Sequence, residues 1–389
     1  MKRSDTADGR KDLRQVPSPI AKPVYTFDHD PTPEEMRAMA IRAMHDMVSV
    51  QWFPKETVRY RKQGAVSNKQ FEFLAEKYYM GLPYTSAGMG LFQFLAFYDE
   101  KTGCLNFTDQ DRFNLTIGNS CASSVGWGLA AVCSSISGSC ISNFLTISNG
   151  FLPLGGVTYD PAITDLKTYE TKRIIEDNGP DKVLAGYCAV QPGDVLFYAE
   201  DTPAAGHTRM ALEAAQVVRN PDGSIDPDQS TITTQEQAAK DHEDTSSGIL
   251  MYRGGQISKT YTFNEFLKKN YIAVSTAEFL GKKPYETCHL TYEGKSDTPA
   301  DLAAGALRCN YPMAILRLLD ISEDGEKVLL HRLFDRKMIG SGLARHYPLA
   351  ELFAEAEETG ILPARGASLA LEITASTGEV FRPVTVKIR

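Results

Sequence analysis

The sequence lacks any long hydrophobic run: no stretch of about 18 consecutive apolar residues occurs, so we expect no membrane span. Met1–Val24 is polar and lacks the apolar segment of a secretory signal, which predicts a cytoplasmic location for the chain as it stands. Positive charge is also in deficit, with 41 Lys and Arg against 49 Asp and Glu and a net charge of −8. This balance argues against nucleic acid and anionic membranes as partners.

Several chemical motifs are absent as well. There is no GxxxxGK[ST] phosphate loop and no GxSxG nucleophile elbow. Cys288-His289 has no further metal ligands at a recognisable spacing, so we predict neither a zinc site nor any other cofactor. The seven cysteines are odd in number and irregularly spaced, which predicts free thiols in a reducing compartment rather than a disulfide framework. They are Cys104, Cys121, Cys133, Cys140, Cys188, Cys288 and Cys309.

The composition is that of an ordinary globular protein, with 42% hydrophobic and 23% charged residues, and 389 residues favour two domains. Residues 1–30, rich in charge and proline, are predicted to be a disordered leader. We place a first domain, beginning with helices, at 31–285. Residues 300–389 are predicted to form an immunoglobulin-like β-sandwich with no chemistry of its own.

Within the first domain, Thr32, Pro33 and Glu35 form the start signal of a helix with a capping box. Further helices are predicted over Asn68–Tyr79, 122–137 and Thr262–Lys269. Strands are predicted at Val195–Tyr198, His207–Val218, Ser230–Gln237 and Tyr271–Val274, with a tight turn at 220–223 and a polar loop at 238–248.

In the second domain the predicted strands are Met313–Leu319, Lys327–Phe334, Ala367–Thr374 and Phe381–Ile388. One helix, Leu349–Glu358, interrupts them.

Cys121 is the candidate nucleophile. It follows the loop-like Gly118-Asn119-Ser120 and directly precedes an apolar helical run. The positive end of a helix dipole lowers the pKa of a thiol, and small neighbours such as Ser123 let a substrate backbone approach. The alternative, an inert buried cysteine at a helix start, is common for a cysteine taken alone.

His207 is the candidate base, because it stands at the start of a strand-like run and can face a nucleophile on a helix. A third group should orient it. Folding the two predicted strands about the turn at 221–222 brings His207 opposite Gln235, Glu236 and Gln237. We favour Glu236, although a one-residue change of register exchanges the facing side chains.

Taken together, these residues resemble the NlpC-type papain-like cysteine peptidases of bacterial cell-wall metabolism. Gly81-Leu82-Pro83-Tyr84 followed by Gly88 is similar to the family's Gly-x-Pro-Tyr loop, and Cys121-Ala122-Ser123 is similar to its Cys-Ser-Gly nucleophile segment. Pro192-Gly193-Asp194-Val195 and Gly206-His207 resemble its Pro-Gly-Asp-Leu and Gly-His strands. The resemblance covers residues 70–280, and the order of Cys before His is not that of the permuted acyltransferases.

The resemblance implies an α+β fold in which a helix bearing Cys121 packs on a small antiparallel sheet bearing His207. It implies hydrolysis of an amide through a thioester, with Tyr84, Ser120 and Ser123 lining the substrate site and a peptide or peptidoglycan fragment as substrate. A cell-wall location would follow if a signal has been removed.

The sequence also departs from the family's pattern. Ser120 replaces the usual Asp, Ala122 and Ser123 replace Ser and Gly, and an insertion around 138–185 lengthens the distance from Cys to His. Two rival functions therefore stay open, a catalytically silent binding protein of the same fold and an acyltransferase.

Overall fold

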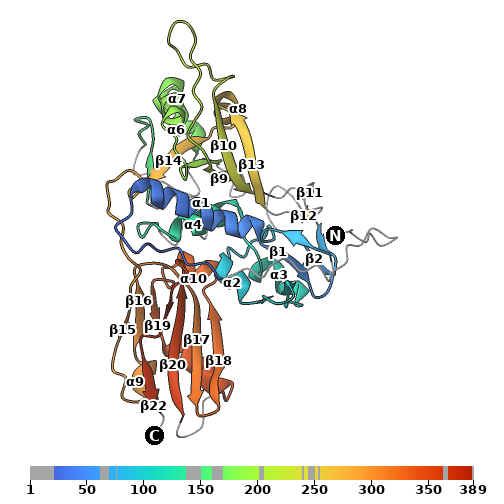
Figure 1. Cartoon of the computed structure of the whole chain (residues 1–389), viewed down its shortest axis with the longest axis vertical. Coiled ribbons are helices and arrows are strands. Elements are labelled where there is room, and N and C mark those ends of the chain that lie inside the picture. Colours follow the sequence, from blue (N-terminus) through green and yellow to red (C-terminus); the bar gives the residue numbers. More distant parts are fainter. Residues whose placement is uncertain are drawn as a thin grey trace.

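The computed structural model describes residues 22–61, 70–75, 77–136, 150–159, 170–200, 206–238, 241–243, 250–252, 255–361 and 367–387. Helices and several small sheets combine in one mixed α/β structure, compatible with the predicted α+β class. In Figure 1 one sheet lies at the top, helices α1 (Pro33–Ser49) and α4 (Cys121–Ala130) cross the middle, and the C-terminal sheets lie at the bottom.

Helix α1 begins where its sequence signals predict. Thr32 is the N-cap: its hydroxyl accepts a hydrogen bond from the Glu35 N–H at 3.2 Å. The Glu35 carboxylate accepts one from the Thr32 N–H at 2.8 Å. Met36, Met44 and other apolar residues at helical spacing are buried. The predicted capping box and apolar face are therefore both confirmed.

The upper sheet has six strands, and every neighbouring pair in it is antiparallel. Val195–Ala199 and Ile272–Thr276 confirm two of the predicted strands. In spatial order the strands are β13 (Gly255–Thr262), β10 (Thr231–Gln237), β9 (Gly206–Ala211), β8 (Val195–Ala199), β14 (Ile272–Thr276) and β7 (Phe151–Pro153).

Strands β9 and β10 are the predicted hairpin, but β9 ends at Ala211 rather than Val218. Thr234 pairs with Ala211 and Gln235 with Met210. The turn expected at 220–223 is present, with the Gly223 N–H donating to the Asn220 carbonyl at 2.9 Å. If the two strands folded directly about the turn at 221–222, each residue would pair two positions away from its observed partner. The irregular backbone between Ala211 and the turn causes this difference in register. A shift of two residues keeps each side chain on its predicted face.

A second six-stranded sheet contains short pieces of the chain, and a two-stranded ribbon lies beside it. The strands of this sheet, in spatial order, are β11 (Asp241–Glu243), β12 (Leu250–Tyr252), β4 (Tyr79–Met80), β1 (Gln51–Pro54), β6 (Cys104–Leu105) and β5 (Tyr98–Asp99), and those of the ribbon are β2 (Val58–Arg61) and β3 (Gln70–Phe73). The predicted polar loop at 238–248 is wrong at Asp241–Glu243, which pairs with β12; residues 239–240 and 244–248 lie outside the described part.

The helix predicted over Asn68–Tyr79 is wrong, because Gln70–Phe73 is strand β3, paired antiparallel with β2. Phe71 and Phe73, two residues apart, are both fully buried, and Phe71 stacks on Tyr60 with ring centroids 5.0 Å apart. Leu74, expected on the apolar face of the helix, is 42% exposed. Aromatic packing at a period of two therefore outweighs the helical spacing. Asn68 lies outside the described residues.

The other helices are short. Helix α8 (Phe263–Lys268) begins at the capping box of Thr262 and Glu265, close to its predicted bounds. Helix α4 ends at Ala130, seven residues before the predicted end at 137, and residue 137 itself lies outside the described part. The remaining helices are α2 (Leu91–Leu95), α3 (Gln110–Thr116), α6 (Thr171–Asn178), α7 (Pro180–Cys188), α9 (Pro299–Ala303), α10 (Arg336–Gly340) and α11 (Ala350–Glu358).

The C-terminal part contains a three-stranded sheet and a five-stranded sheet. The expected strand Phe381–Ile388 is split in two around Pro383, which has no N–H to donate. The three-stranded sheet begins at Leu290, before the predicted boundary at 300. The strands are β15 (Leu290–Glu293), β16 (Ala306–Cys309) and β19 (His346–Pro348) in one sheet, and β17 (Met313–Ser322), β18 (Gly325–Leu333), β20 (Ser368–Ala375), β21 (Val380–Phe381) and β22 (Thr385–Lys387) in the other.

Side chains from the C-terminal part bond to the end of helix α4. The Ser376 hydroxyl donates to the Ala130 carbonyl at 2.6 Å, and the Tyr311 hydroxyl to the Val132 carbonyl at 3.1 Å. Carbonyls in the last turn of a helix have no partner within the helix, so Ser376 satisfies the Ala130 carbonyl from outside, and Tyr311 does the same for Val132 in the turn that follows. The C-terminal sheets thereby complete the end of the helix that begins at Cys121.

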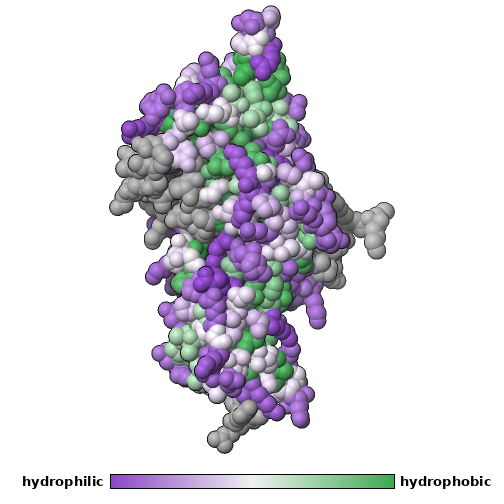
Figure 2. All heavy atoms as spheres, turned by 90° about the vertical axis from the view of Figure 1, so that its left-hand side faces the viewer, coloured by the Kyte–Doolittle hydropathy of each residue, from purple (hydrophilic) through white to green (hydrophobic). Residues whose placement is uncertain are grey.

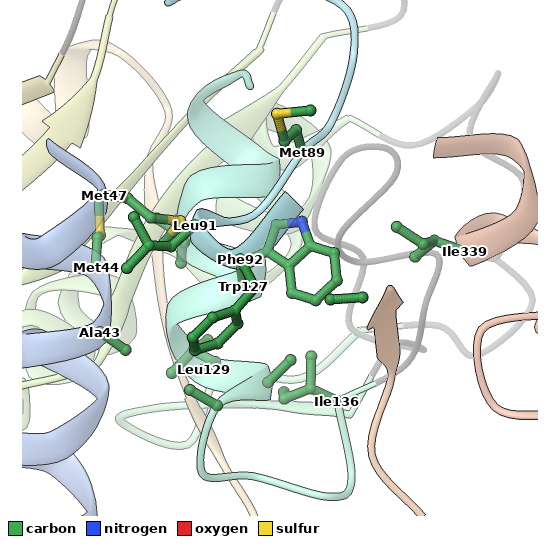
Figure 3. Close-up of a cluster of buried hydrophobic side chains, with 14 of the residues drawn as sticks. Ala43, Met44, Met47, Met89, Leu91, Phe92, Trp127, Leu129, Ile136 and Ile339 are labelled. Atoms are coloured by element: carbon green, nitrogen blue, oxygen red, sulfur yellow. The ribbon is translucent and has the colours of Figure 1, made fainter. Parts of the chain in front are cut away.

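The hydrophobic core is continuous around helix α4. Figure 3 shows Met44 and Met47 of α1 on one side of α4 and Phe92 beside Trp127. The indole N–H of Trp127 donates to the Gly88 carbonyl at 2.9 Å. All ten residues of α4 are buried.

The prediction of a disordered leader over residues 1–30 is wrong around Tyr25. Tyr25 is 2% exposed, its N–H donates to the Thr377 carbonyl at 2.7 Å, and its hydroxyl donates to Asp46 at 2.9 Å. An aromatic side chain that fills the core fixes this segment, although charge and proline surround it in the sequence. Residues 1–21 lie outside the described part.

The surface mixes polar and apolar areas, as the face in Figure 2 shows. The large apolar side chains that are exposed in the described residues are scattered over several segments: Val24, Leu74, Leu115, Val217, Val218, Val328 and Val380. In that same part of the chain, no helix has both the length and the apolar character that crossing a bilayer requires.

Candidate active site

Cys121 is the first residue of helix α4, and its side chain is 4% exposed. The N-cap is Ser120, whose extended backbone (φ −119°, ψ 177°) leads into the helix. The Ser120 N–H donates to the Ser123 hydroxyl at 2.8 Å. The positive end of the helix dipole therefore lies at Cys121, where it favours a negative charge on the sulfur.

The loop that resembles the family's Gly-x-Pro-Tyr motif is bonded to the residues just before Cys121. The Asn119 N–H donates to the Pro83 carbonyl at 2.9 Å, and the Thr85 N–H donates to the Asn119 carbonyl at 2.7 Å. These bonds form a parallel bridge between Tyr84 and Asn119. The loop and the start of α4 are thus held as one unit.

Gly118 makes this close pairing possible. Its φ of +98° is in the region that favours glycine, and a Cβ at this position would lie 2.2 Å from the Pro83 carbonyl oxygen. Any larger residue would separate the loop from the helix start.

The loop places the phenol of Tyr84 next to the thiol, with its oxygen 4.0 Å from Cys121 Sγ. Burial, followed by the negative charge at Cys121, raises the pKa of the Tyr84 hydroxyl. The phenol therefore keeps its proton and can donate it towards the sulfur.

His207 and Glu236 face the same site from neighbouring strands. His207 Nε2 bonds to Glu236 Oε2, and the side chains are 16% and 1% exposed. Gln235 and Gln237 point elsewhere: Gln235 bonds to His45 Nδ1 at 3.3 Å and Gln237 to the Leu82 carbonyl. Of the three candidates for the third residue, Glu236 is thus the one in contact with the imidazole.

The pKa of His207 reports its contact with the thiol. Burial lowers this pKa, but the negative charge at Cys121, a hydrogen bond with Cys121 and the hydrogen bond with Glu236 together raise it to about 9. With this raised pKa the imidazole is protonated at neutral pH, beside the Cys121 thiol. An ion pair of imidazolium and thiolate is the reactive form of a cysteine nucleophile.

Arg209 is a member of the site that the sequence analysis did not name. Its Nη1 lies 2.6 Å from Glu236 Oε2, its Nε donates to the Tyr271 hydroxyl at 3.1 Å, and its guanidinium lies 4.2 Å from the centre of the Tyr261 ring. Arg209 follows His207 by two residues on one strand, so both project from the same face. The spacing of two residues from His207 is the feature of the sequence that could have indicated Arg209 as a member of the site.

A pocket of about 470 Å³ extends from His207 along this face of the sheet towards α8. Five aromatic rings line it, with Lys268 and Lys269 among the other residues. The rings belong to Tyr84, Tyr198, Tyr261, Phe266 and Tyr271. Ser120 and Ser123, predicted to bind substrate, bond to each other at the helix start and are not among the lining residues.

Comparison with family models, with curated proteins and with solved structures gives no match to this chain. Within the described ranges, no group of three or more His, Cys, Asp and Glu side chains is placed to hold a metal ion. The chemistry of the site therefore has to be inferred from its own side chains.

Replacing Gly118 by Ala should destabilise the protein by about 3 kcal/mol or more, because a left-handed backbone conformation and a steric clash both oppose the methyl group. Gly223→Ala is the matched control: Gly223 has a φ of +85° but nothing within 4 Å of a Cβ, so we expect a loss of about 1 kcal/mol. Urea unfolding curves measure both. Equal losses would contradict the role of the Gly118 contact.

The rate at which iodoacetamide alkylates Cys121 should change near pH 9, where His207 loses its proton and the ion pair ends. Glu236→Gln removes a hydrogen bond that raises the pKa of His207, so the change should move to lower pH. Mass spectrometry of the alkylated peptide over a pH series measures it. Glu213→Gln, an exposed site next to β9, is the control and should leave the profile in place. An unchanged profile in Glu236→Gln would be the contrary result.

Arg209→Met should shift the same profile to higher pH, because the charge of Arg209 lowers the pKa of His207. Arg209→Lys keeps the charge and should restore most of the wild-type position while losing the bond to Tyr271. A purely structural role for Arg209 predicts no shift in either variant once both are shown to be folded.

Proposed function

We propose that this protein is a cysteine hydrolase, a peptidase or amidase of papain-like α+β fold followed by a β-sandwich. The observation that carries the proposal is the meeting of Cys121, His207 and Glu236, which come from the start of α4, from β9 and from β10. A thiol, a base in contact with it and a carboxylate in contact with the base are the parts that nucleophilic catalysis by cysteine needs.

The reaction would proceed in two halves. Cys121 Sγ attacks the carbonyl carbon of an amide, and the protonated His207 gives its proton to the leaving nitrogen as the C–N bond breaks. Water then attacks the thioester, His207 takes a proton from it, and the acid leaves as the C–S bond breaks. The backbone N–H of Cys121, in the first turn of α4, is assigned to the carbonyl oxygen as it gains charge.

Glu236 and Arg209 have supporting roles in this scheme. Glu236, 1% exposed, holds the imidazole in place and stabilises its positive charge. Arg209 and the Tyr261 hydroxyl, which donates to Glu236 Oε1 at 3.3 Å, orient that carboxylate. Burying a carboxylate is costly unless it is paired, and these contacts supply the pairing.

The pocket beside His207 indicates where part of the substrate lies. The leaving nitrogen receives its proton from His207, so the group attached to that nitrogen lies on the His207 side of the thiol. We therefore assign the aromatic pocket to the leaving group. The acyl part would lie over Cys121 and Ser120. Ser120 cannot supply the charge of the Asp usual in the cell-wall peptidases, so γ-D-glutamyl peptides of peptidoglycan are a candidate substrate among other peptide amides.

A second candidate, a silent binding protein of the same fold, is favoured by one observation: the Cys121 side chain is only 4% exposed. A bound ligand could use the same pocket with no access to the sulfur. The acyltransferase alternative uses the same thioester, resolved by an amine in place of water.

Hydrolysis of peptide amides, including γ-D-glutamyl dipeptides and muropeptide fragments, should fall at least about 10³-fold in Cys121→Ala, because the nucleophile is removed. Products are identified by mass spectrometry, with and without an added amine acceptor to detect transfer. Cys104→Ala, a change at a partly exposed thiol in β6, is the control and should keep the wild-type rate.

If Cys121→Ala hydrolysed these amides at the wild-type rate, Cys121 would not be the nucleophile. Retention of these ligands by both proteins, with no turnover by the wild type, would select the binding function.

A further inference from the structure

Two cysteines of the C-terminal part meet outside the candidate active site. Cys288 Sγ and Cys309 Sγ are 3.8 Å apart, and the residues are 8% and 3% exposed. Cys309 ends β16, and Cys288 comes two residues before β15, which pairs with β16. Leu290 is the cross-strand partner of Cys309, so Cys288, two residues from Leu290, is on the same face of the sheet.

Strand register explains how thiols 21 residues apart in sequence come together. The antiparallel pairing of β15 with β16 continues one residue beyond the strand, where the Asn310 N–H donates to the His289 carbonyl at 3.3 Å and the His289 N–H to Asn310 Oδ1 at 2.9 Å. Both sulfurs therefore occupy a fixed diagonal position across two bonded strands. A disulfide needs an S–S distance of about 2 Å, so the two sulfurs would have to approach further from the 3.8 Å seen here.

The two thiols are not equivalent. The hydrogen bond from Cys288 lowers the pKa of Cys309, the bond from the Tyr311 backbone and the charge of Arg345 lower it further, and burial opposes the shift. The same thiol contact, together with burial, raises the pKa of Cys288. In the 3.8 Å contact either sulfur can be the donor, and the directions of the two pKa shifts favour Cys309 as the thiol that ionises first.

We propose that Cys288 and Cys309 are a disulfide-forming site whose oxidant is a low-molecular-weight disulfide. The Cys309 thiolate attacks one sulfur of that molecule, forms a mixed disulfide and releases one small thiolate. The Cys288 thiol then loses its proton and attacks the Cys309 sulfur, which releases the second small thiolate. Two protein thiols are oxidised, one small disulfide is reduced to two thiols, and the two protons go to the released thiolates.

The site has a structural consequence because of where it lies. The Tyr311 hydroxyl, two residues after Cys309, donates to the Val132 and Glu286 carbonyls at 3.1 and 2.7 Å. Arg345 donates to the Ile136 carbonyl at 2.7 Å. Cys288 lies on the segment that connects the upper sheet to β15, and Cys309 ends β16. A Cys288–Cys309 bond would therefore link that segment to β16, close to the residues that follow helix α4. This cross-link is independent of the proposed hydrolase function.

The test uses the full-length protein incubated with oxidised glutathione, then alkylated with N-ethylmaleimide and digested with trypsin without reduction. Lys283–Lys295 and Cys309–Arg317 are tryptic peptides with one cysteine each, so the bond gives one linked pair of defined mass. We expect that pair, and a melting temperature about 5 °C higher in the oxidised than in the reduced protein, because the bond closes a loop of about 20 residues.

Cys288→Ser and Cys309→Ser should each abolish both the linked peptide and the difference in melting temperature. Cys104→Ser, at a thiol elsewhere in the chain, should keep both. Recovery of Cys288 and Cys309 as separate alkylated or glutathione-modified peptides would overturn the proposal, as would a melting difference that persists in Cys288→Ser. If a serine variant fails to fold, the wild-type peptide map decides alone.

Discussion

The complete burial of helix α4 is the constraint on which the arrangement of the site depends. An amphipathic helix at a surface can rotate or shift slightly, but a helix buried on every side has one position. Its sequence is suited to this, since Gly128 lies where a Cβ would be 3.0 Å from Met44 Cβ. Gly90, in the preceding segment, makes similar room for the Trp127 ring. The packing of the core thus fixes the place of the sulfur at the helix start.

Around this fixed helix, the site concentrates charge in a nearly dry region. Glu236 is in contact with both His207 and Arg209, and Cys121 lies on the other side of the His207 imidazole. Isolated charges of this kind would be expensive to bury, whereas a paired group tolerates burial and shifts the pKa of its members. Two tyrosines of the pocket donate to this group, Tyr84 to the Cys121 sulfur and Tyr261 to the Glu236 carboxylate.

The sequence predicted well those features that depend on local chemistry. The capping box at Thr32 indicated the start of helix α1, and the Asn220–Gly223 turn indicated the hairpin. The proximity of His207 and Glu236 was predicted despite an error in register, because the error was two residues and left the faces unchanged. The resemblance to the peptidase family pointed to the Tyr84 loop, which the structure places beside Cys121.

Features that depend on distant partners could not be predicted. The spacing of Phe71 and Leu74 suited a helix, and only packing against Tyr60 makes the segment a strand. Tyr25 belongs to a polar leader by composition, yet burial in the core and a bond to Thr377 hold it. In the sequence Arg209 has the features of an ordinary strand residue, and its role depends on the contact with Glu236 that the fold creates. The closeness of Cys288 and Cys309 follows from a strand pairing that their irregular spacing does not reveal.

The bonds from Ser376 and Tyr311 to the end of α4 bear on how the chain can be divided. A shortened chain that ends near residue 285 would contain every residue of the candidate catalytic group, yet it would leave the Ala130 and Val132 carbonyls without these partners. It would also uncover the apolar side chains of the continuous core. The C-terminal sheets are therefore better regarded as part of the body that holds the candidate site than as an appended module. Exchanging them for another sheet domain would require the new domain to supply the same hydroxyl donors.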